Sequence, residues 1–307
     1  MSFDPTPTAD SSPTADADRA GSLTDPAPAP QPAAPARGRN RRQAVLEVVR
    51  KSRLSPRLIR VTLGGEQFSE LRTNDFTDAY VKLLIAQPGS GLRPPYDMDA
   101  IREQDPELMP SRRTYTVRNW DHEAGTIDLD FVLHGHGDDD GEDGIAARWA
   151  DIAQPGDRIA LSGAGGAYSP DPEASSHLLI GDHAALPAIA AALERMTADA
   201  RGIALIHLEH EDDVLTIDHP AGVEVHWVIG EREQLLAEAA ALDLAEVEGL
   251  QVFCHAERGL TKQLRRLLVT ERQIPREAIS ISAYWALGRV EDQFQAEKRE
   301  DIGKIDD

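Results

Sequence analysis

The sequence contains only one cysteine, Cys254, among its 307 residues. A single cysteine excludes an internal disulfide, a cysteine-ligated iron–sulfur cluster and a cysteine-rich zinc site, and we expect no metal site. Long apolar runs are also missing, since none approaches the roughly 20 residues that a membrane-spanning helix needs. The first ten residues have neither the cationic nor the apolar region of a secretory signal. We therefore expect a cytoplasmic protein with no insertion into a membrane.

Positive charge is in short supply, with 32 Lys and Arg residues against 53 Asp and Glu residues and a formal net charge of −21. A chain this negative repels phosphate and anionic membrane surfaces except at a local basic patch. We therefore expect no nucleic-acid partner, and an anionic ligand must be met by a few well-placed cations. The length is typical of two domains that each bury a core, and it leaves the oligomeric state open.

Residues 1 to 40 contain 8 of the 20 prolines, mixed with Ala, Ser, Thr and Asp. A segment of this composition has almost nothing to bury, so we predict a disordered tail over residues 1–40. The basic run Arg37–Arg42 follows the most proline-rich part. We interpret this run as a solvated junction, with nucleic-acid binding as the alternative.

Short segments that alternate polar and apolar residues follow the tail. In the clearest of them, Ile127, Leu129 and Phe131 fall on one face. Because only one short helical stretch, Ile145–Ala153, lies among these segments, they predict a closed antiparallel β-barrel. The expected strands are Ala44–Val49, Leu58–Leu63, Tyr80–Ile85, Arg113–Arg118, Thr126–Gly135 and Asp157–Gly163.

After about residue 175, strand-like and helix-like segments alternate. This order predicts a parallel sheet with helices on both faces. The only cysteine falls in one of the expected strands and is expected to be part of the core. The expected strands are His177–Asp182, Gly202–His210, Val223–Ile229, Leu250–Ala256 and Ala278–Trp285. The expected helices are Leu186–Met196, Gln234–Val247 and Leu260–Arg272.

Several stretches of the chain resemble one protein family in their order and spacing. RTYTVR (Arg113–Arg118) matches the R-x-Y-T/S flavin motif of the ferredoxin-reductase-like superfamily. The stretches DFVLHG, GIAARWADIAQPGDRIALSGAGGAY, HLLIGDHAALPAIAAALE and AYWALGRVEDQFQAEKRE resemble the siderophore-interacting protein family over about residues 40 to 300. Members of that family are FAD-dependent, NAD(P)H-linked ferric-siderophore reductases.

The resemblance implies a division of the chain into domains. We expect an antiparallel Greek-key FAD-binding barrel over residues 41–172 and a parallel-sheet, NAD(P)-binding-like α/β domain over residues 173–287. A charged C-terminal helix or tail over residues 288–307 is expected to lie on the surface.

The resemblance also implies a flavin site. Arg113 is expected to face the flavin phosphates, and Tyr115 and Thr116 to contact the ring. The helix start near Gly144 offers N–H groups to a pyrophosphate. The pair Tyr284–Trp285 is expected beside the flavin, with a core or interface anchor as the alternative. The residues assigned to the flavin are Arg113, Tyr115, Thr116, Arg118, His134, Gly144, Ala146, Ala147, Trp149, Tyr284 and Trp285.

NAD(P)H is expected at the C-terminal ends of the parallel strands. No G-x-G-x-x-G fingerprint is present, so the resemblance alone assigns Gly181, Asp182 and Glu257 to this cofactor. Lys82 matches a lysine with which the family attracts anionic ferric siderophores, and an ordinary surface charge is the alternative. The chain departs from the family pattern at His183, Ala184 and Ala256.

We therefore expect a reductase that passes electrons from NAD(P)H through FAD to a ferric siderophore and releases Fe(II). No side chain need act as an acid or base, because the cofactor performs the chemistry. Two alternatives stay open. One is a general NAD(P)H:flavin or electron-transfer reductase, and the other is a flavin- or siderophore-binding protein with a degenerate nicotinamide site.

Overall fold

The computed structural model describes residues 43–133, 144–244, 248–289, 291–298 and 300–305. All of them belong to one unit, Arg39–Asp307. The predicted tail over residues 1–40 and the site residue His134 lie outside the described residues. None of the helices within the described ranges has the length and apolar character needed to cross a membrane.

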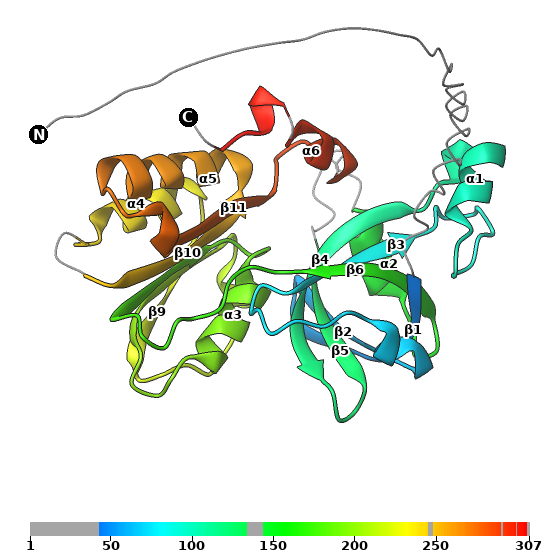
Figure 1. The fold of residues 1–307 in the computed structure, drawn as a ribbon, viewed down its shortest axis with the longest axis horizontal. Helices are drawn as coiled ribbons and strands as arrows, with labels where there is room; N and C mark the ends of the chain where they lie inside the picture. Colours follow the sequence, from blue (N-terminus) through cyan, green and yellow to red (C-terminus); the bar gives the residue numbers. More distant parts are fainter. Residues whose placement is uncertain (1–42, 134–143, 245–247, 290, 299, 306–307) are drawn as a thin grey trace, which may run out of the picture. The chain divides into compact units, whose positions relative to one another are not determined.

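The first half of this unit is a closed barrel of six antiparallel strands, as predicted (Figure 1). The strand order, β1-β2-β5-β4-β3-β6, joins strands that are distant in sequence. Apolar side chains such as Val61, Leu83 and Leu129 are fully buried in its interior, and helix α2 (Ile145–Ile152) adds Ala146 to the same core. The strands are β1 Gln43–Ser55, β2 Leu58–Gly64, β3 Tyr80–Ile85, β4 Ser111–Asp121, β5 Thr126–Val132 and β6 Arg158–Gly165.

Strand β4, which carries the R-x-Y-T motif, has an open edge along the motif. It pairs with β3 over residues 111–116, whereas its pairing with β5 starts only at Val117. The backbone groups on this side of the motif therefore have no ladder partner in β5, and they are available to other segments or to a ligand.

The second half contains a parallel sheet of five strands in the order β11-β10-β7-β8-β9. Its residues alternate between two cores, so Leu179 and Phe253 face helix α3 while Ile180 and Cys254 face helices α4 and α5. Figure 1 shows α3 on one face of the sheet and α4 and α5 on the other. The elements are β7 Ser176–Gly181, α3 Leu186–Arg195, β8 Arg201–Leu208, β9 Gly222–Ile229, α4 Glu233–Ala241, β10 Leu250–Glu257, α5 Arg258–Arg265 and β11 Ile279–Trp285.

Three helical segments differ from the sequence-based expectation. Helix α4 ends at Ala241, because the next residue, Leu242, has an extended backbone. The helix expected up to Arg272 changes from α to π geometry over Arg266–Glu271. Helix α1 (Met98–Gln104) was not predicted. It spans only two turns and is capped by the Asp97 side chain. A helix this short shows no periodic pattern of apolar residues in the sequence.

The C-terminal segment is more than a charged surface tail. Helix α6 (Glu291–Glu297) follows β11 and buries Phe294, which is only 1 % exposed, against Ala283 and Ala286. A single aromatic residue among charges gives no periodic pattern, so its burial was not expected from sequence.

Candidate functional site

Tyr115 of the motif lies in an aromatic cluster that joins three elements. Its ring is 4.3 Å from the ring of Phe131 on β5, and Phe131 is 5.8 Å from Trp149 on α2, measured between centroids. Burial raises the pKa of Tyr115, so its phenol stays neutral. Phe131 is fully buried, whereas Tyr115 and Trp149 are only partly buried, so their two rings are the aromatic surfaces that a planar ligand can contact.

Helix α2 begins next to this cluster, at Gly144. No side chain caps the N–H groups of its first turn, and that turn contains no acidic residue. Ala146 and Ala147 are small and buried, so no bulky side chain projects from this end. An uncapped helix start attracts anions because its N–H groups and the helix dipole both favour negative charge.

The two arginines of the motif, Arg113 and Arg118, both bind carboxylates in the structure. Arg118 forms a two-pronged ion pair with Glu194 of α3, with one contact of 2.8 Å. Arg113 lies 3.3 Å from Asp292 of α6, whose side chain is 66 % exposed. An ion pair with so exposed an acid contributes about 1 kcal/mol or less. Arg113 is therefore the arginine that a phosphate group can recruit at the lower cost.

The opposite face of the motif meets the end of the parallel sheet. Thr116 lies close enough to Tyr284 of β11 to act on its hydroxyl, whose pKa is raised by burial and lowered by Thr116. The Tyr284 ring is 4.7 Å from the ring of His255, which in turn stacks on Phe253 at 4.2 Å. Tyr284 therefore contacts both the flavin motif and the core of the sheet domain.

His255 is a buried histidine that sequence analysis did not single out. It is 4 % exposed, its Nε2 lies 3.1 Å from the Ser280 hydroxyl, and its Nδ1 has no hydrogen-bond partner. Burial and the nearby charge of Lys298 lower the pKa of His255 to about 3. Its imidazole is therefore neutral at physiological pH.

Asp182, Glu257 and Trp285 meet at the C-terminal edge of the sheet, as the fold predicts. Asp182 accepts hydrogen bonds from the Trp285 indole and from the backbone N–H of Glu257, both at 2.8 Å. Burial raises the pKa of Asp182, and these donors oppose that shift. Glu257 in turn caps α5 by accepting from the Leu260 N–H at 3.0 Å. The network fixes the ends of β7, β10 and β11 in relation to one another.

Gly181 has a packing role beside this network. A side chain there would place its Cβ 2.6 Å from the Cβ of Ala185, so only glycine lets the turn after β7 lie this close to α3.

A cavity of about 330 Å³ opens at the same edge. Arg232, which follows β9, is the cation among its lining residues, and its guanidinium lies 6.0 Å from the centre of the Trp285 ring. Sequence analysis did not select Arg232, although its place just after a strand of a parallel sheet was a usable signal. The lining residues are Glu231, Arg232, Glu233, Glu257, Gly259, Leu260, Gln263 and Leu287.

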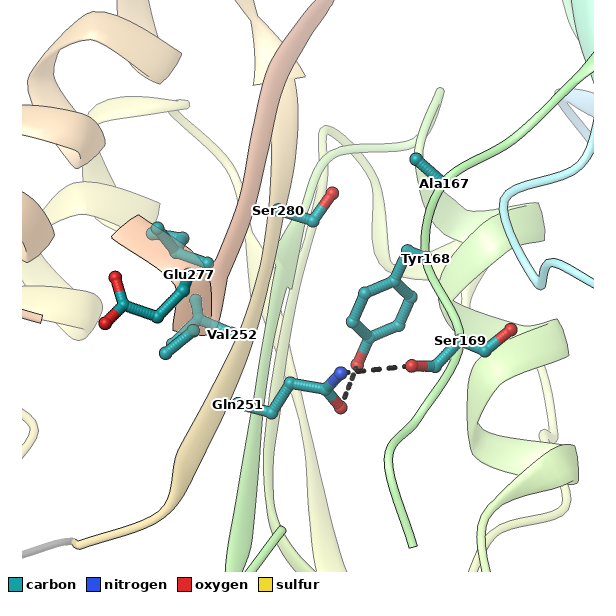
Figure 2. Close-up of a pocket in the computed structure, with 9 residues that line it drawn as sticks. Ala167, Tyr168, Ser169, Gln251, Val252, Glu277 and Ser280 are labelled. Carbon is teal, nitrogen blue, oxygen red and sulfur yellow. Dashed lines mark hydrogen bonds between the residues drawn. The ribbon is translucent and has the colours of Figure 1, made fainter. Parts of the chain in front are cut away.

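A second cavity, of about 290 Å³, contains none of the predicted site residues (Figure 2). Among its lining residues, Gln251 forms two hydrogen bonds through its side-chain amide. The amide oxygen accepts from the Asp171 N–H at 2.9 Å, and the amide nitrogen donates to the Ser169 carbonyl at 3.0 Å. Figure 2 shows the Tyr168 hydroxyl directed at the same amide. These bonds hold the connection between β6 and β7 against β10, which is a structural role.

Lys82 on β3 lies directly beside the flavin motif. Its ammonium donates to the Thr114 hydroxyl at 3.0 Å and lies 5.4 Å from the centre of the Tyr80 ring. Thr114 also binds the carboxylate of Glu291. Sequence analysis missed Glu291 and Lys298 because it had no means of placing α6 against the barrel.

Comparisons with known proteins agree with this geometry. The siderophore-interacting FAD-binding domain family matches residues 47–168, and the siderophore-interacting protein family matches residues 174–288. The ferric vibriobactin reductase ViuB of Vibrio cholerae is 33 % identical over 266 residues, which cover 83 % of this chain and 93 % of that protein. An uncharacterized protein of Mycobacterium tuberculosis is 40 % identical over 271 residues, covering 83 % of this chain and 94 % of its own.

Solved structures show the same architecture. The siderophore-interacting protein SipS from Aeromonas hydrophila superposes with a TM-score of 0.69 at 30 % identity, covering 86 % of this chain and 99 % of its own. A siderophore utilization protein from T. fusca has a TM-score of 0.68 at 29 % identity, with coverage of 81 % and 94 %. The ferredoxin reductase of carbazole 1,9a-dioxygenase, at 17 % identity and a TM-score of 0.58, covers 80 % of this chain and 70 % of its own and shares the fold.

Proposed function

We propose that this chain, which belongs to the siderophore-interacting protein family, passes electrons from NAD(P)H through FAD to a ferric siderophore. The observation that carries the proposal is the contact of Thr116 in the flavin motif with Tyr284 at the end of the parallel sheet. This contact brings the barrel and the C-terminal edge of the sheet to one place. We assign FAD binding to residues 41–172, NAD(P)H binding to residues 173–287, and a charged C-terminal helix or tail to residues 288–307.

The residues present fit an FAD molecule. The partly buried rings of Tyr115 and Trp149 offer aromatic surface, Thr116 offers a hydroxyl, and Arg113 and the uncapped start of α2 offer positive charge for the pyrophosphate. FAD, when bound, accepts a hydride from NAD(P)H and supplies single electrons to Fe(III). The protein binds and orients the reactants and excludes water, so it needs no side chain as acid or base.

The departures from the family pattern leave room for NAD(P)H. Ala256 is fully buried in the core formed with α4 and α5, so its methyl group does not fill the cavity beside Arg232. Asp182 accepts hydrogen bonds from Ala184 in the following turn and from Glu257 and Trp285 at the ends of the neighbouring strands. An intact edge of this kind supports a working nicotinamide site over a degenerate one.

The substrate side of the proposal rests on Lys82, whose ammonium is held beside the motif by Thr114. Reduction releases the metal because anionic oxygen ligands hold the smaller, more highly charged Fe(III) more tightly than Fe(II). We place the reaction in the cytoplasm, where NAD(P)H is available.

Spectroscopy of the purified protein tests the proposal. We expect a yellow protein, or one that becomes yellow with added FAD, whose flavin absorbance bleaches with NADH or NADPH under anaerobic conditions. A ferrous chelator should then report Fe(II) after a ferric siderophore is added. A protein that cannot be loaded with FAD contradicts the proposal. Bleaching without Fe(II) formation favours a general electron-transfer reductase, and flavin binding without bleaching favours a binding protein.

A further inference from the structure

A carboxylate lies close to Lys82, the residue predicted to bind the substrate. Glu291 is the first residue of α6. Its carboxylate accepts hydrogen bonds from the backbone N–H of Thr114 at 2.9 Å and from the Thr114 hydroxyl at 2.6 Å. The same hydroxyl accepts a hydrogen bond from Lys82 at 3.0 Å. Thr114 therefore links Lys82, which is predicted to attract an anion, to Glu291, which repels anions.

Lys298 completes this group of charges. Its ammonium lies 4.6 Å from the centre of the Phe294 ring. Burial lowers the pKa of Lys298, the Glu291 carboxylate opposes this shift, and the Lys82 ammonium adds to it. Glu291 and Lys82 are therefore both close enough to act on Lys298. We call these three residues the charge cluster, and their formal charges sum to a single positive charge.

The charge cluster adjoins the predicted flavin surface. Lys298 acts electrostatically on His255, whose ring packs on Tyr284, and Tyr284 lies beside Thr116 of the motif. A ferric complex close enough to receive an electron from the flavin therefore approaches these charges.

Helix α6 holds the carboxylate in place. Phe294 anchors the helix in a buried apolar site, and Glu297 bonds to Arg258 at 2.5 Å and to Arg289 at 2.6 Å. With its backbone fixed and its carboxylate bonded to Thr114, Glu291 can move away from an incoming anion only by giving up two donors, the N–H and the hydroxyl of Thr114.

We propose that Glu291 sets the charge selectivity of the substrate site, because it cancels one of the two lysine charges and so weakens the attraction of highly anionic ferric siderophores. The proposal rests on the proposed function and names a substrate class for it. Three hydroxamates neutralise Fe(III), whereas three catecholates leave the complex with a triple negative charge. Charge repulsion from Glu291 therefore disfavours the ferric triscatecholate and leaves the neutral ferric trihydroxamate unaffected.

The size of the effect follows from Coulomb's law. One unit charge about 8 Å from a trianion changes its affinity about tenfold in water, and about threefold at physiological salt. The same change of charge has almost no effect on a neutral complex.

Binding of gallium complexes tests the proposal without depending on electron transfer. Ga(III) forms complexes of the same charge as Fe(III), and it is not reduced. We would measure the Kd of Ga(III) trihydroxamate and Ga(III) triscatecholate for the FAD-loaded protein and for Glu291→Gln. Glutamine keeps an oxygen that can accept the Thr114 N–H. The control is Asp301→Asn, which removes the same charge from a carboxylate that is 95 % exposed and paired with Lys304.

We expect Glu291→Gln to tighten binding of the triscatecholate by about threefold at 0.15 M salt and about tenfold at low salt. Binding of the trihydroxamate and both affinities of Asp301→Asn should stay within about twofold. Lys298→Gln should weaken binding of the triscatecholate, because it removes a positive charge. Equal changes for both complexes, no change for either, or no binding at all would overturn the proposal. Selective binding of the gallium complexes by a protein whose FAD is not reduced by NAD(P)H would instead count against the proposed function alone.

Discussion

Tyr115 illustrates what a single residue does in this site. Its ring packs on Phe131, and burial keeps its phenol neutral. Neither observation gives the hydroxyl a charged role. The contribution of Tyr115 to a flavin site therefore comes from the ring surface, which phenylalanine also provides.

Replacing Tyr115 separates these two contributions. We expect Tyr115→Ala to weaken FAD binding by about tenfold, since stacking of an aromatic side chain on a base is worth about 1–3 kcal/mol. Tyr115→Phe should retain FAD. The measurement is the flavin-to-protein ratio after dialysis, together with the Kd from quenching of flavin fluorescence. Equal flavin retention by wild type and Tyr115→Ala would show that the ring site is elsewhere.

His255 makes a prediction about pH. Its pKa in the folded protein, about 3, is below the ordinary 6.5, so the unfolded chain takes up a proton that the folded chain refuses. Stability therefore falls as the pH drops from 6.5 towards 3. Between pH 7 and pH 5 this residue should cost about 2 kcal/mol of unfolding free energy.

Urea unfolding of wild type and His255→Gln at several pH values checks this. We expect the free energy of unfolding to fall by about 2 kcal/mol less in the variant than in wild type between pH 7 and pH 5. Between pH 7 and pH 8 the difference between the two proteins should stay constant. Parallel losses in both proteins over the acidic range would contradict the assignment.

At the scale of elements, α6 joins the C-terminal segment to the flavin motif on β4. The helix is short, so its own hydrogen bonds cannot keep it folded, and its position depends on docking. Phe294 supplies the apolar contact, and Glu297 supplies the ionic contacts to Arg258 and Arg289. The orientation of Glu291 depends on this docking.

Phe294→Ala should therefore release α6. Loss of a buried phenylalanine costs about 3–5 kcal/mol, which exceeds what a single short helix contributes. We expect rapid hydrogen exchange over residues 291–297, with protection in the barrel strand β5 unchanged as the internal control. Unchanged protection of α6 would show that the ionic contacts suffice.

At the scale of the whole molecule, a buried aspartate links the barrel to the parallel-sheet domain. Asp213, 1 % exposed, accepts from the Ser55 hydroxyl at 2.7 Å and from the backbone and guanidinium of Arg57 at 3.0 and 2.9 Å. Burial alone would raise the pKa of Asp213, but these hydrogen bonds outweigh it and lower the pKa below 3.8. The link is therefore intact at neutral pH and is lost as the pH falls through this lowered pKa.

Asp213→Asn should destabilise the protein by about 2–3 kcal/mol, since an amide replaces a buried carboxylate among charged and polar donors. The control is Asp151→Asn, which breaks the exposed pair with Arg53 and should cost less than about 1 kcal/mol. Thermal unfolding at pH 7 measures both. In wild type alone, part of the stability should disappear below about pH 3.8. Equal melting temperatures of the two variants would contradict a special role for Asp213.

Much of the fold could be predicted because its signals are local. The strand Tyr80–Ile85 has the predicted bounds, and the alternation of strands and helices after residue 175 indicated the parallel sheet. Helix α1 was missed because its start depends on one capping side chain, and the change to π geometry at Arg266 has no sequence signal of its own.

The two kinds of domain, the burial of Cys254 and the motif that points to a flavin could be predicted from the sequence, because each depends on residues that are neighbours in the chain. Which charges meet depends on the folded arrangement of the chain. Glu291 binds Thr114 across 177 positions, and Trp285 binds Asp182 across 103. Coulomb energies and hydrogen bonds depend on distance in space, and folding alone sets that distance for residues so far apart in sequence.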